Sequence, residues 1–179
     1  MIHILTGPVH SGKTTLLKNI LFPLKEQDLS IDGYLSEAVR KHGDTQGYDL
    51  YDLKEHRYYP FIRKKGRKDW QSIGPFFFFP ETLDLAKKII YRSEKAHLCV
   101  VDEVGPLELD DKGVWPAIAE VFRMFQMDFL FVVRDVILEN FLARMERDDT
   151  GVYSIEQKNI QSALSGSIVS NLKKRRNST

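Results

Sequence analysis

The chain has 179 residues, 42% of them hydrophobic and 28% charged, which is the composition of an ordinary globular protein with one buried core. Its 26 Lys and Arg residues and 25 Asp and Glu residues leave a formal net charge of +1, which does not argue for a polyanionic partner, and we expect no nucleic acid to bind. The single cysteine, Cys99, excludes an internal disulfide, and no apolar run approaches the roughly 20 residues of a membrane span. We therefore expect a cytoplasmic protein, monomeric or weakly oligomeric, with no membrane contact.

The first half of the chain changes from a helical pattern to a β-rich one. Residues 2–5 form a short apolar run that predicts a strand, and it enters a Gly-rich turn. Apolar residues then recur at helical spacing up to Pro23. Three β-rich segments separated by polar turns follow and predict hairpins or a meander, at residues 31–39, 47–53 and 57–62.

The second half predicts strands that alternate with helices. A basic loop at residues 63–68 precedes a run of four phenylalanines at 76–79, which predicts a buried strand ending at Pro80. The apolar run 98–101 suits a central parallel strand. The other predicted elements are helices at 81–93, 115–124 and 137–147, strands at 128–133 and 152–155, and a C-terminal helix ending near residue 172.

This order of elements predicts an α/β fold. Strands alternating with helices imply a mainly parallel central sheet flanked by helices, and the β-rich segment reads as an insertion into it. We expect one domain over residues 1–172. Residues 173–179 are basic and are predicted to form a disordered tail.

The turn after the first strand has the pattern of a phosphate-binding loop, Gly-x-x-x-x-Gly-Lys-Thr. Glycines let backbone N–H groups point at phosphate oxygens, and the helix that follows adds its positive dipole end. We expect Lys13 to reach the β and γ phosphates, Thr14 to ligate Mg²⁺ and Thr15 to line the pocket near the α-phosphate. The nucleotide-binding residues of this segment are Gly7, Pro8, Val9, His10, Ser11, Gly12, Lys13, Thr14 and Thr15, with His10 acting through its backbone rather than its ring.

Two acidic residues end the predicted central strand at the edge where α/β proteins bind ligands. Asp102 is the predicted carboxylate on the magnesium side, and Glu103 is placed to orient or deprotonate an attacking water. Alternatively, Glu103 caps the turn at residues 104–106. The acidic pair lies about ninety residues after the phosphate loop, which leaves room for an extra strand between them.

A further cation is expected to stabilise the negative charge that develops on the γ-phosphate. Arg134, at the end of the predicted strand 128–133, is the candidate, and Arg144 and Arg147 are the reserves. The alternative for Arg134 is an ordinary surface ion pair. The catalytic set predicted from the sequence is therefore Lys13, Glu103 and Arg134.

These residues resemble a known family, the small P-loop nucleoside triphosphatases that include the cancer-related nucleoside triphosphatase and its thermophilic microbial relatives. The markers are the phosphate loop, the segment Gly-Tyr-Leu-Ser-Glu-Ala-Val-Arg at 33–40, and above all Val-Asp-Glu-Val-Gly-Pro-Leu-Glu-Leu at 101–109. The chain departs from the family pattern at Gln46, where the family tends to carry Arg, at His10, where Gly is common, and at Asn159-Ile160 in place of Asn-Arg.

The resemblance implies a P-loop NTPase fold of the additional-strand, catalytic-glutamate type. It also implies slow, Mg²⁺-dependent hydrolysis of ATP, GTP and other nucleoside triphosphates to diphosphate and phosphate, with loose base selectivity. By the same resemblance Glu37 and Arg40 would lie beside the nucleotide, and Glu108 would support the end of the catalytic strand.

Two other functions remain open at this stage. A nucleoside or small-metabolite kinase would use the same phosphate cradle, with the basic loop at 63–68 as the lid. A nucleotide-dependent switch or assembly ATPase would instead act by changing the conformation of a partner.

Overall fold

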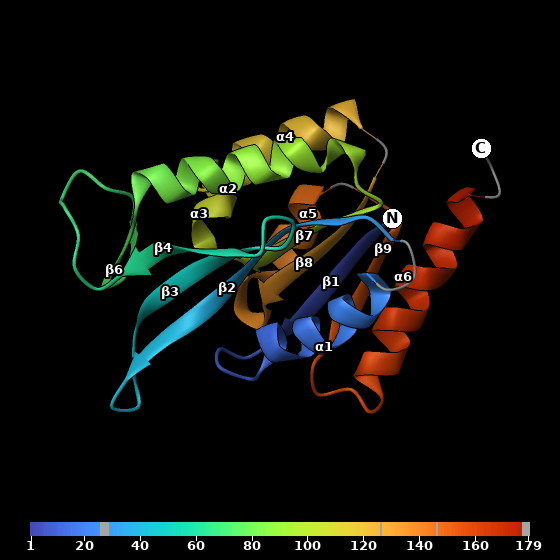
Figure 1. Cartoon of the computed structure of the whole chain (residues 1–179), viewed down its shortest axis with the longest axis horizontal. Coiled ribbons are helices and arrows are strands. Elements are labelled where there is room, and N and C mark those ends of the chain that lie inside the picture. The colour runs from blue at the N-terminus through green and yellow to red at the C-terminus, as the bar shows by residue number, and fades with distance from the viewer. Residues whose placement is uncertain (26–28, 126, 146, 177–179) are drawn as a thin grey trace.

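The computed structural model describes residues 1–25, 29–125, 127–145 and 147–176 as one sheet with helices on both faces (Figure 1). Within these residues the sheet has nine strands, in the order β5-β6-β4-β3-β2-β7-β8-β1-β9. The strands are β1 (Ile2–Gly7), β2 (Ile31–Lys41), β3 (Asp44–Asp52), β4 (Arg57–Arg63), β5 (Ser72–Ile73), β6 (Phe76–Phe78), β7 (Leu98–Val104), β8 (Asp128–Arg134) and β9 (Thr150–Ser154). The helices are α1 (Lys13–Lys25), α2 (Pro80–Arg92), α3 (Pro106–Leu109), α4 (Trp115–Met124), α5 (Leu138–Met145) and α6 (Ile160–Arg176), with 3₁₀ turns η1 (Ser93–Lys95) and η2 (Asp135–Ile137).

The sheet is mixed, which corrects the expectation of a mainly parallel one. Strands β2, β7, β8, β1 and β9 run parallel to one another, whereas β3, β4, β6 and β5 are joined to β2 by successive antiparallel pairs. Strand β2 belongs to both halves, because it pairs with β7 through residues 31–34 and with β3 through residues 34–41. The β-rich segment thus extends the central sheet by hairpins.

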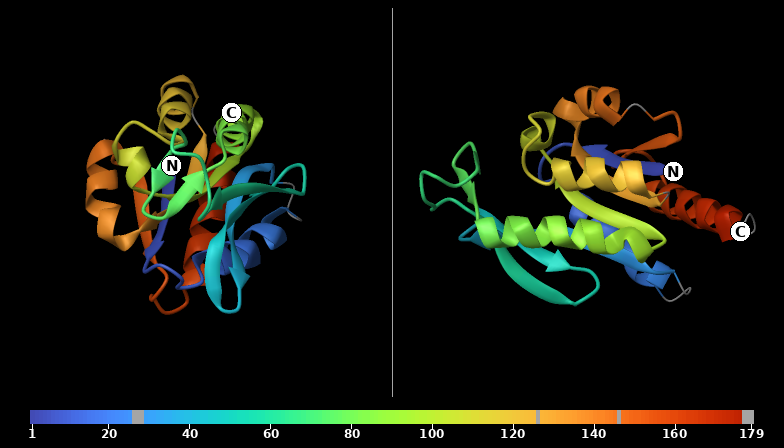
Figure 2. Two further views of the ribbon diagram at one scale, coloured as in Figure 1. Left: turned by 90° about the vertical axis from the view of Figure 1, so that its left-hand side faces the viewer. Right: turned by 90° about the horizontal axis from the view of Figure 1, so that it is seen from above.

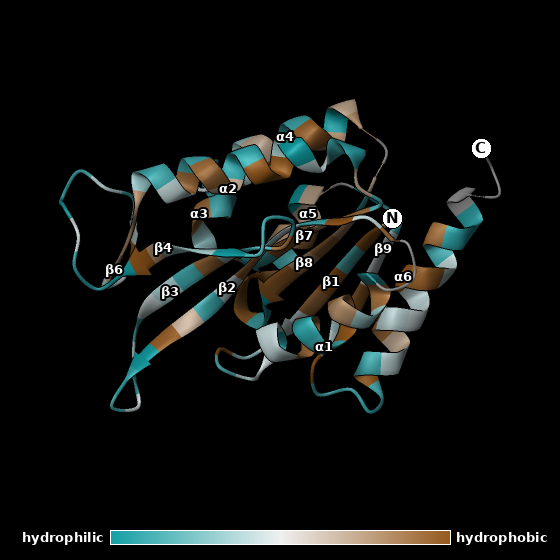
Figure 3. Ribbon diagram, in the orientation of Figure 1, coloured by the Kyte–Doolittle hydropathy of each residue, from teal (hydrophilic) through white to brown (hydrophobic). Residues whose placement is uncertain are grey.

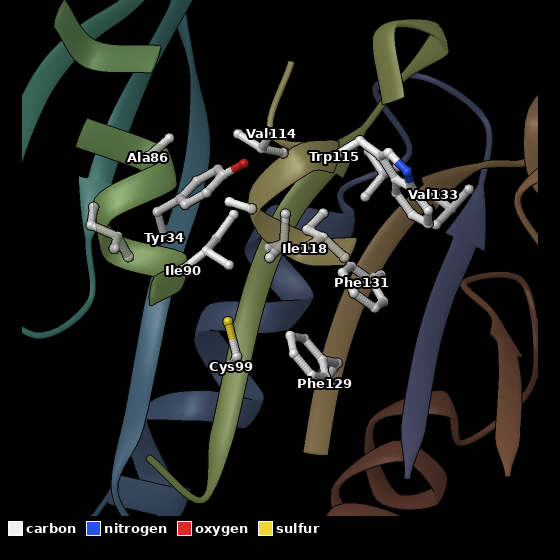
Figure 4. Close-up of a cluster of buried hydrophobic side chains, with 14 of the residues drawn as sticks. Tyr34, Ala86, Ile90, Cys99, Val114, Trp115, Ile118, Phe129, Phe131 and Val133 are labelled. Atoms are coloured by element: carbon white, nitrogen blue, oxygen red, sulfur yellow. The ribbon is translucent and has the colours of Figure 1, made fainter. Parts of the chain in front are cut away.

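Two hydrophobic cores form because side chains alternate between the faces of each strand. On one face, Phe129 and Phe131 of β8 pack with residues of α2, α4 and α5. The close-up in Figure 4 shows the part of this core that includes Ile90 of α2 and Ile118 of α4. On the other face, Leu130 and Val132 pack with residues of α1 and α6. Figure 2 shows the layers from two further directions, and Figure 3 shows that the central strands are the most hydrophobic part of the molecule. Cys99 is free and buried in the first core.

Two local predictions differ from the structure. The run of phenylalanines forms only a three-residue strand, β6, in which Phe78 is buried and Phe76 and Phe77 are half-buried, because β6 lies near the edge of the sheet. Helix α6 continues to Arg176, so Lys173 and Lys174 are helical where a disordered tail was predicted, and residues 177–179 lie outside the described part. Across the described residues, no helix combines the length and apolarity required to span a membrane.

Candidate active site

The phosphate-loop segment connects β1 directly to α1 and depends on two glycines. Gly7 has a φ of 149°, and a Cβ at this position would lie 2.5 Å from Cγ2 of Ile155. Gly12 has a φ of 90°, a conformation that residues with a side chain rarely adopt. His10 also has a positive φ, of 63°, at a position where Gly is common in the family that the sequence resembles. The loop backbone therefore requires the glycines of the motif.

Lys13 is the first residue of α1, and its side chain turns back over the loop. Its Nζ donates hydrogen bonds to the carbonyl oxygens of Gly7 at 2.9 Å and Pro8 at 2.5 Å, and to Oγ of Ser11 at 3.3 Å. Burial lowers the pKa of Lys13, and Glu103 and Asp102 oppose this shift. The ammonium group is thus held inside the loop by backbone carbonyls.

Thr14, at the start of α1, and Asp102, near the end of β7, bring two oxygen ligands together. Oγ1 of Thr14 donates to Oδ2 of Asp102 at 2.8 Å, and the backbone N–H of Ser36 donates to the same oxygen at 3.0 Å. Asp102 is buried, and burial raises its pKa to about 7 against the lowering effect of these two hydrogen bonds. A hydroxyl and a carboxylate are the oxygen ligands that Mg²⁺ prefers, and this ion usually takes only one or two carboxylates from the protein.

Asp102 and Glu103 lie in a β-bulge of β7. The pairing of β7 with β8 shifts between Val101 and Val104, and Glu103 has a φ of 70°. One extra residue in a strand turns its side chain away from the regular alternation, as bulges near functional sites often do. The carboxylate of Glu103 forms an ion pair with the guanidinium of Arg134 at the end of β8. The two predicted carboxylates, Asp102 and Glu103, and the predicted cation, Arg134, are therefore neighbours.

The turn after β7 is capped by Glu108 rather than by Glu103. Oε2 of Glu108 accepts a hydrogen bond from the N–H of Gly105 at 2.8 Å, and its Oε1 accepts one from the N–H of Val114 at 3.1 Å. The side chain is buried, which raises its pKa to about 7. Glu108 thus fixes the chain that leaves the bulge, in line with its expected support of the strand end.

A cleft of about 290 Å³ joins these groups at the C-terminal ends of the parallel strands. Twelve residues predicted for the site line it, from the loop, from β2 and from the ends of β7 and β8: Val9, His10, Ser11, Gly12, Lys13, Thr14, Thr15, Glu37, Arg40, Asp102, Glu103 and Arg134. Gly7 and Pro8 are absent from the described lining and contribute instead the carbonyls that hold Lys13.

The cleft has further lining residues that the motifs did not identify: Lys18, Ser36, Ala38, Tyr48 and Val132. Lys18 forms an ion pair with Glu37 at 2.6 Å. In the sequence, its position four residues after Thr14, on the same face of the predicted helix, could have indicated that it lines the site. Ser36 and Tyr48 lie within or beside the β-rich segments that carry the resemblance, but no spacing rule marks them as site residues.

The reserve residues and the lid candidate lie elsewhere. Arg144 pairs with Asp111, with its guanidinium carbon 4.4 Å from the centre of the Trp115 ring, and Arg147 pairs with Asp149. Among the described residues that line the cleft, none comes from the basic loop at 63–68.

The sequence matches a family model described as NTPase over residues 2–169. The nucleoside-triphosphatase THEP1 of Metallosphaera sedula is 29% identical over 161 residues, which cover 80% of this chain and 86% of the relative. The cancer-related nucleoside-triphosphatase homolog of Mus musculus is 26% identical over 176 residues, covering 89% and 90% of the two chains.

Two solved structures share the fold. One is the crystal structure of THEP1 from Aquifex aeolicus, with a TM-score of 0.74 and 20% identity over 96% of this chain and 99% of that one. The other is the solution structure of a human cancer-related nucleoside triphosphatase, with a TM-score of 0.72 and 23% identity over 96% of each chain. Because the family model spans most of the sequence, this chain belongs to the NTPase family.

Proposed function

We propose that this protein hydrolyses nucleoside triphosphates, ATP and GTP among them, to the diphosphate and phosphate in a Mg²⁺-dependent reaction with loose base selectivity. One observation carries the proposal: Glu103 and Arg134 form an ion pair on the wall of the cleft that the phosphate loop enters. A carboxylate able to take a proton from water and a cation able to stabilise a phosphoryl group are the parts that hydrolysis requires. The names of the relatives, nucleoside-triphosphatases, support the same reaction.

The loop and the cleft supply the binding groups. The backbone N–H groups of residues 9–15 and the N-terminal end of α1 suit a triphosphate. Lys13 exchanges its bonds with loop carbonyls for bonds with phosphate oxygens, so its ammonium group moves only a short way. Thr14 and Asp102 are the residues that would hold Mg²⁺, which when bound neutralises phosphate charge.

Catalysis then depends on the groups at the bulge. Glu103 orients the attacking water and accepts its proton, and the bulge is what brings its carboxylate to the γ-phosphate end of the cleft. Arg134 and Lys13 stabilise the charge that develops on the phosphoryl oxygens. Glu108 keeps the bulge in place through its two backbone hydrogen bonds.

The same features support the assignment to the additional-strand, catalytic-glutamate type of P-loop NTPase. In this type the strand of the phosphate loop and the strand of the acidic pair are separated by another strand, and β8 lies between β1 and β7. We also propose that residues 1–172 act as a single domain, because both cores share this one sheet.

The β2 wall is the proposed contact for the rest of the nucleotide. Glu37 and Arg40 line the cleft from β2, and Lys18 pairs with Glu37 from α1. These are long charged side chains rather than a fitted base pocket, which supports loose selectivity.

Phosphate release from ATP and GTP with Mg²⁺ and no second substrate tests the proposal. We expect Glu103→Gln to lower kcat by about 10²- to 10⁴-fold while nucleotide binding persists, because the amide cannot accept the proton. Lys13→Ala should abolish release through weaker binding and lost charge stabilisation. The matched control is Glu139→Gln, which changes an exposed glutamate of α5 and should leave kcat unchanged.

Two results would contradict hydrolysis. Tight nucleotide binding without phosphate release by the parent chain would redirect the search to an acceptor substrate or an activating partner. Full activity of Glu103→Gln would show that another group activates the water.

A further inference from the structure

A second, smaller cavity lies directly behind the cleft. Its volume is about 40 Å³, and most of its wall consists of aromatic and aliphatic side chains, including Tyr34 and Val114, which face each other in Figure 4. The residues that line both the cleft and this cavity are Ser36, Tyr48, Glu103 and Arg134. The two spaces therefore meet beside the proposed water-activating carboxylate.

The size of the rear cavity restricts what it can hold. One water molecule needs about 10–15 Å³ measured in this way, so 40 Å³ accommodates up to about three. Binding sites for metabolites are on the order of 300 Å³ or more, which excludes an acceptor substrate of ordinary size. Apart from Tyr34 and Glu108, the polar side chains of this mainly apolar wall lie at the end that opens to the cleft.

Two buried polar atoms at that end have no hydrogen-bond partner within the described part of the chain. They are Oγ of Ser36 and Nε of Arg134. A buried polar atom without a partner is unfavourable, and native proteins commonly satisfy such atoms with ordered water. The Glu103 carboxylate lines the same end of the cavity, and a fixed water requires two to four polar partners of this kind.

The backbone of β2 fixes the direction of the Ser36 side chain. The N–H of Ser36 bonds to Asp102, while its side chain shares a strand face with Tyr34, which lines the rear cavity. Leu35 points to the opposite face, into the core under α1. The hydroxyl therefore lies on the cavity side of the sheet, opposite the Asp102 carboxylate and Thr14.

We propose that Ser36 positions the attacking water, holding it beside Glu103 together with Nε of Arg134, and that the rear cavity supplies this water. The inference rests on the proposed hydrolysis. The water oxygen forms a bond to the γ-phosphorus while the bond from phosphorus to the β–γ bridging oxygen breaks. The electron pair of that bond stays on the diphosphate, and the water proton passes to Glu103.

Steady-state phosphate release from ATP with Ser36→Ala and Ser36→Thr tests the role of the hydroxyl. We expect Ser36→Ala to lower kcat by about 10- to 100-fold, because a misplaced nucleophile loses that much, with KM and the half-saturating Mg²⁺ concentration within about twofold of the parent. Ser36→Thr keeps the hydroxyl and should retain kcat within about threefold. The control is Thr6→Val, which removes another buried hydroxyl that has no described partner. Thr6 lies outside the described linings of the cleft and the rear cavity, so this variant should keep the kcat of the parent.

A second pair of variants tests the cavity itself. Val114→Ile adds one methylene to its wall and should lower kcat several-fold with unchanged KM. Val121→Ile makes the same change on α4, at a fully buried residue of the same core that lies outside the described wall, and should leave kcat unchanged. Melting curves of all variants confirm that each one is folded.

The failure of this inference differs from the failure of the proposed function. If the parent chain hydrolyses ATP and Glu103→Gln abolishes the reaction, but Ser36→Ala keeps full kcat, the water site is wrong and the hydrolase stands. If excess Mg²⁺ restores the kcat of Ser36→Ala, the hydroxyl serves the metal instead, and the inference is again overturned. If the parent releases no phosphate, both proposals fall together.

Discussion

Two buried clusters of opposite charges among the described residues are built differently. Arg92, at the end of α2, donates four hydrogen bonds to Asp32 and Asp52, and both carboxylates also accept bonds from backbone N–H groups. Burial alone would raise the pKa of Asp52, but its hydrogen bonds with Arg92 and with the backbone lower it. In the cleft, by contrast, burial prevails and raises the pKa of Asp102 to about 7.

The difference between the clusters lies in their unused hydrogen-bonding capacity. The Arg92 cluster joins α2 to the β2–β3 hairpin and leaves little capacity for a ligand. The cleft cluster contains an unpartnered Arg134 Nε within the described structure, together with the partly exposed carboxylate of Glu103. A saturated cluster stabilises the fold, whereas an incompletely bonded one is ready to bind.

The largest effect should follow from removing the cation of the saturated cluster. We expect Arg92→Leu to lower the free energy of unfolding by about 3–5 kcal/mol, because it leaves two carboxylates buried without their partner. Urea denaturation measures this change. The control is Arg123→Leu, at an exposed arginine of α4, which should change the free energy of unfolding by no more than about 0.5 kcal/mol. A loss of turnover without a loss of stability would show that the Arg92 cluster is part of the active site.

His3 is a buried titratable group outside both clusters, and neither of its ring nitrogens has a hydrogen-bond partner among the described residues. Burial lowers its pKa to about 4, with Asp128 opposing the shift. The unfolded chain therefore binds the proton more tightly, and stability should fall by about 3 kcal/mol as the pH drops from about 6.5 to 4.

Chemical denaturation at several pH values between 4 and 7 measures the slope. His3→Leu should flatten it, whereas replacing the exposed His42 with Gln should leave it unchanged. An equally steep slope in His3→Leu would assign the acid sensitivity to other groups.

The smallest of the three effects is expected at the cation of the cleft. Arg134→Ala should lower kcat about 100-fold, equivalent to about 2.7 kcal/mol, because one stabilising donor is lost. The free energy of unfolding should change by less than about 1 kcal/mol, since Glu103 is partly exposed. Arg144→Ala is the control for turnover, and equal kcat values for the two variants would remove Arg134 from the catalytic set.

The sequence predicted most of the parallel half of the fold, because its strands and helices carry strong periodic patterns. The phosphate loop was recognisable because every position has its own task, and the pair Asp102 and Glu103 followed a buried strand. The family membership inferred from these segments is confirmed by the family model.

Other features depend on contacts between distant segments. The bulge that separates Glu103 from Asp102 arises where β7 meets β8, and the mixed character of the sheet arises where β2 meets both β3 and β7. Ser36 shows the same limit, because its unpartnered hydroxyl becomes evident only when β2 lies beside the acidic strand end.

The divided pairing of β2 makes the cleft mechanically asymmetric. Its floor is made by β1, β7 and β8, which are clamped on both sides by neighbouring strands and covered by helices. One wall consists of the outer part of β2, which beyond Tyr34 has described strand pairing with β3 alone and projects past the body of the sheet (Figure 1). At Glu37 this wall is still backed by β4, because Asp49 of β3, which faces Glu37, pairs with Pro60. The hairpin is two-stranded at Arg40 and Lys41, and isolated two-stranded hairpins are the least stable form of sheet. The catalytic groups thus lie on the multi-stranded part of the sheet, whereas Arg40 lies on its two-stranded projection, which has the greater freedom to adjust to nucleotides of different size.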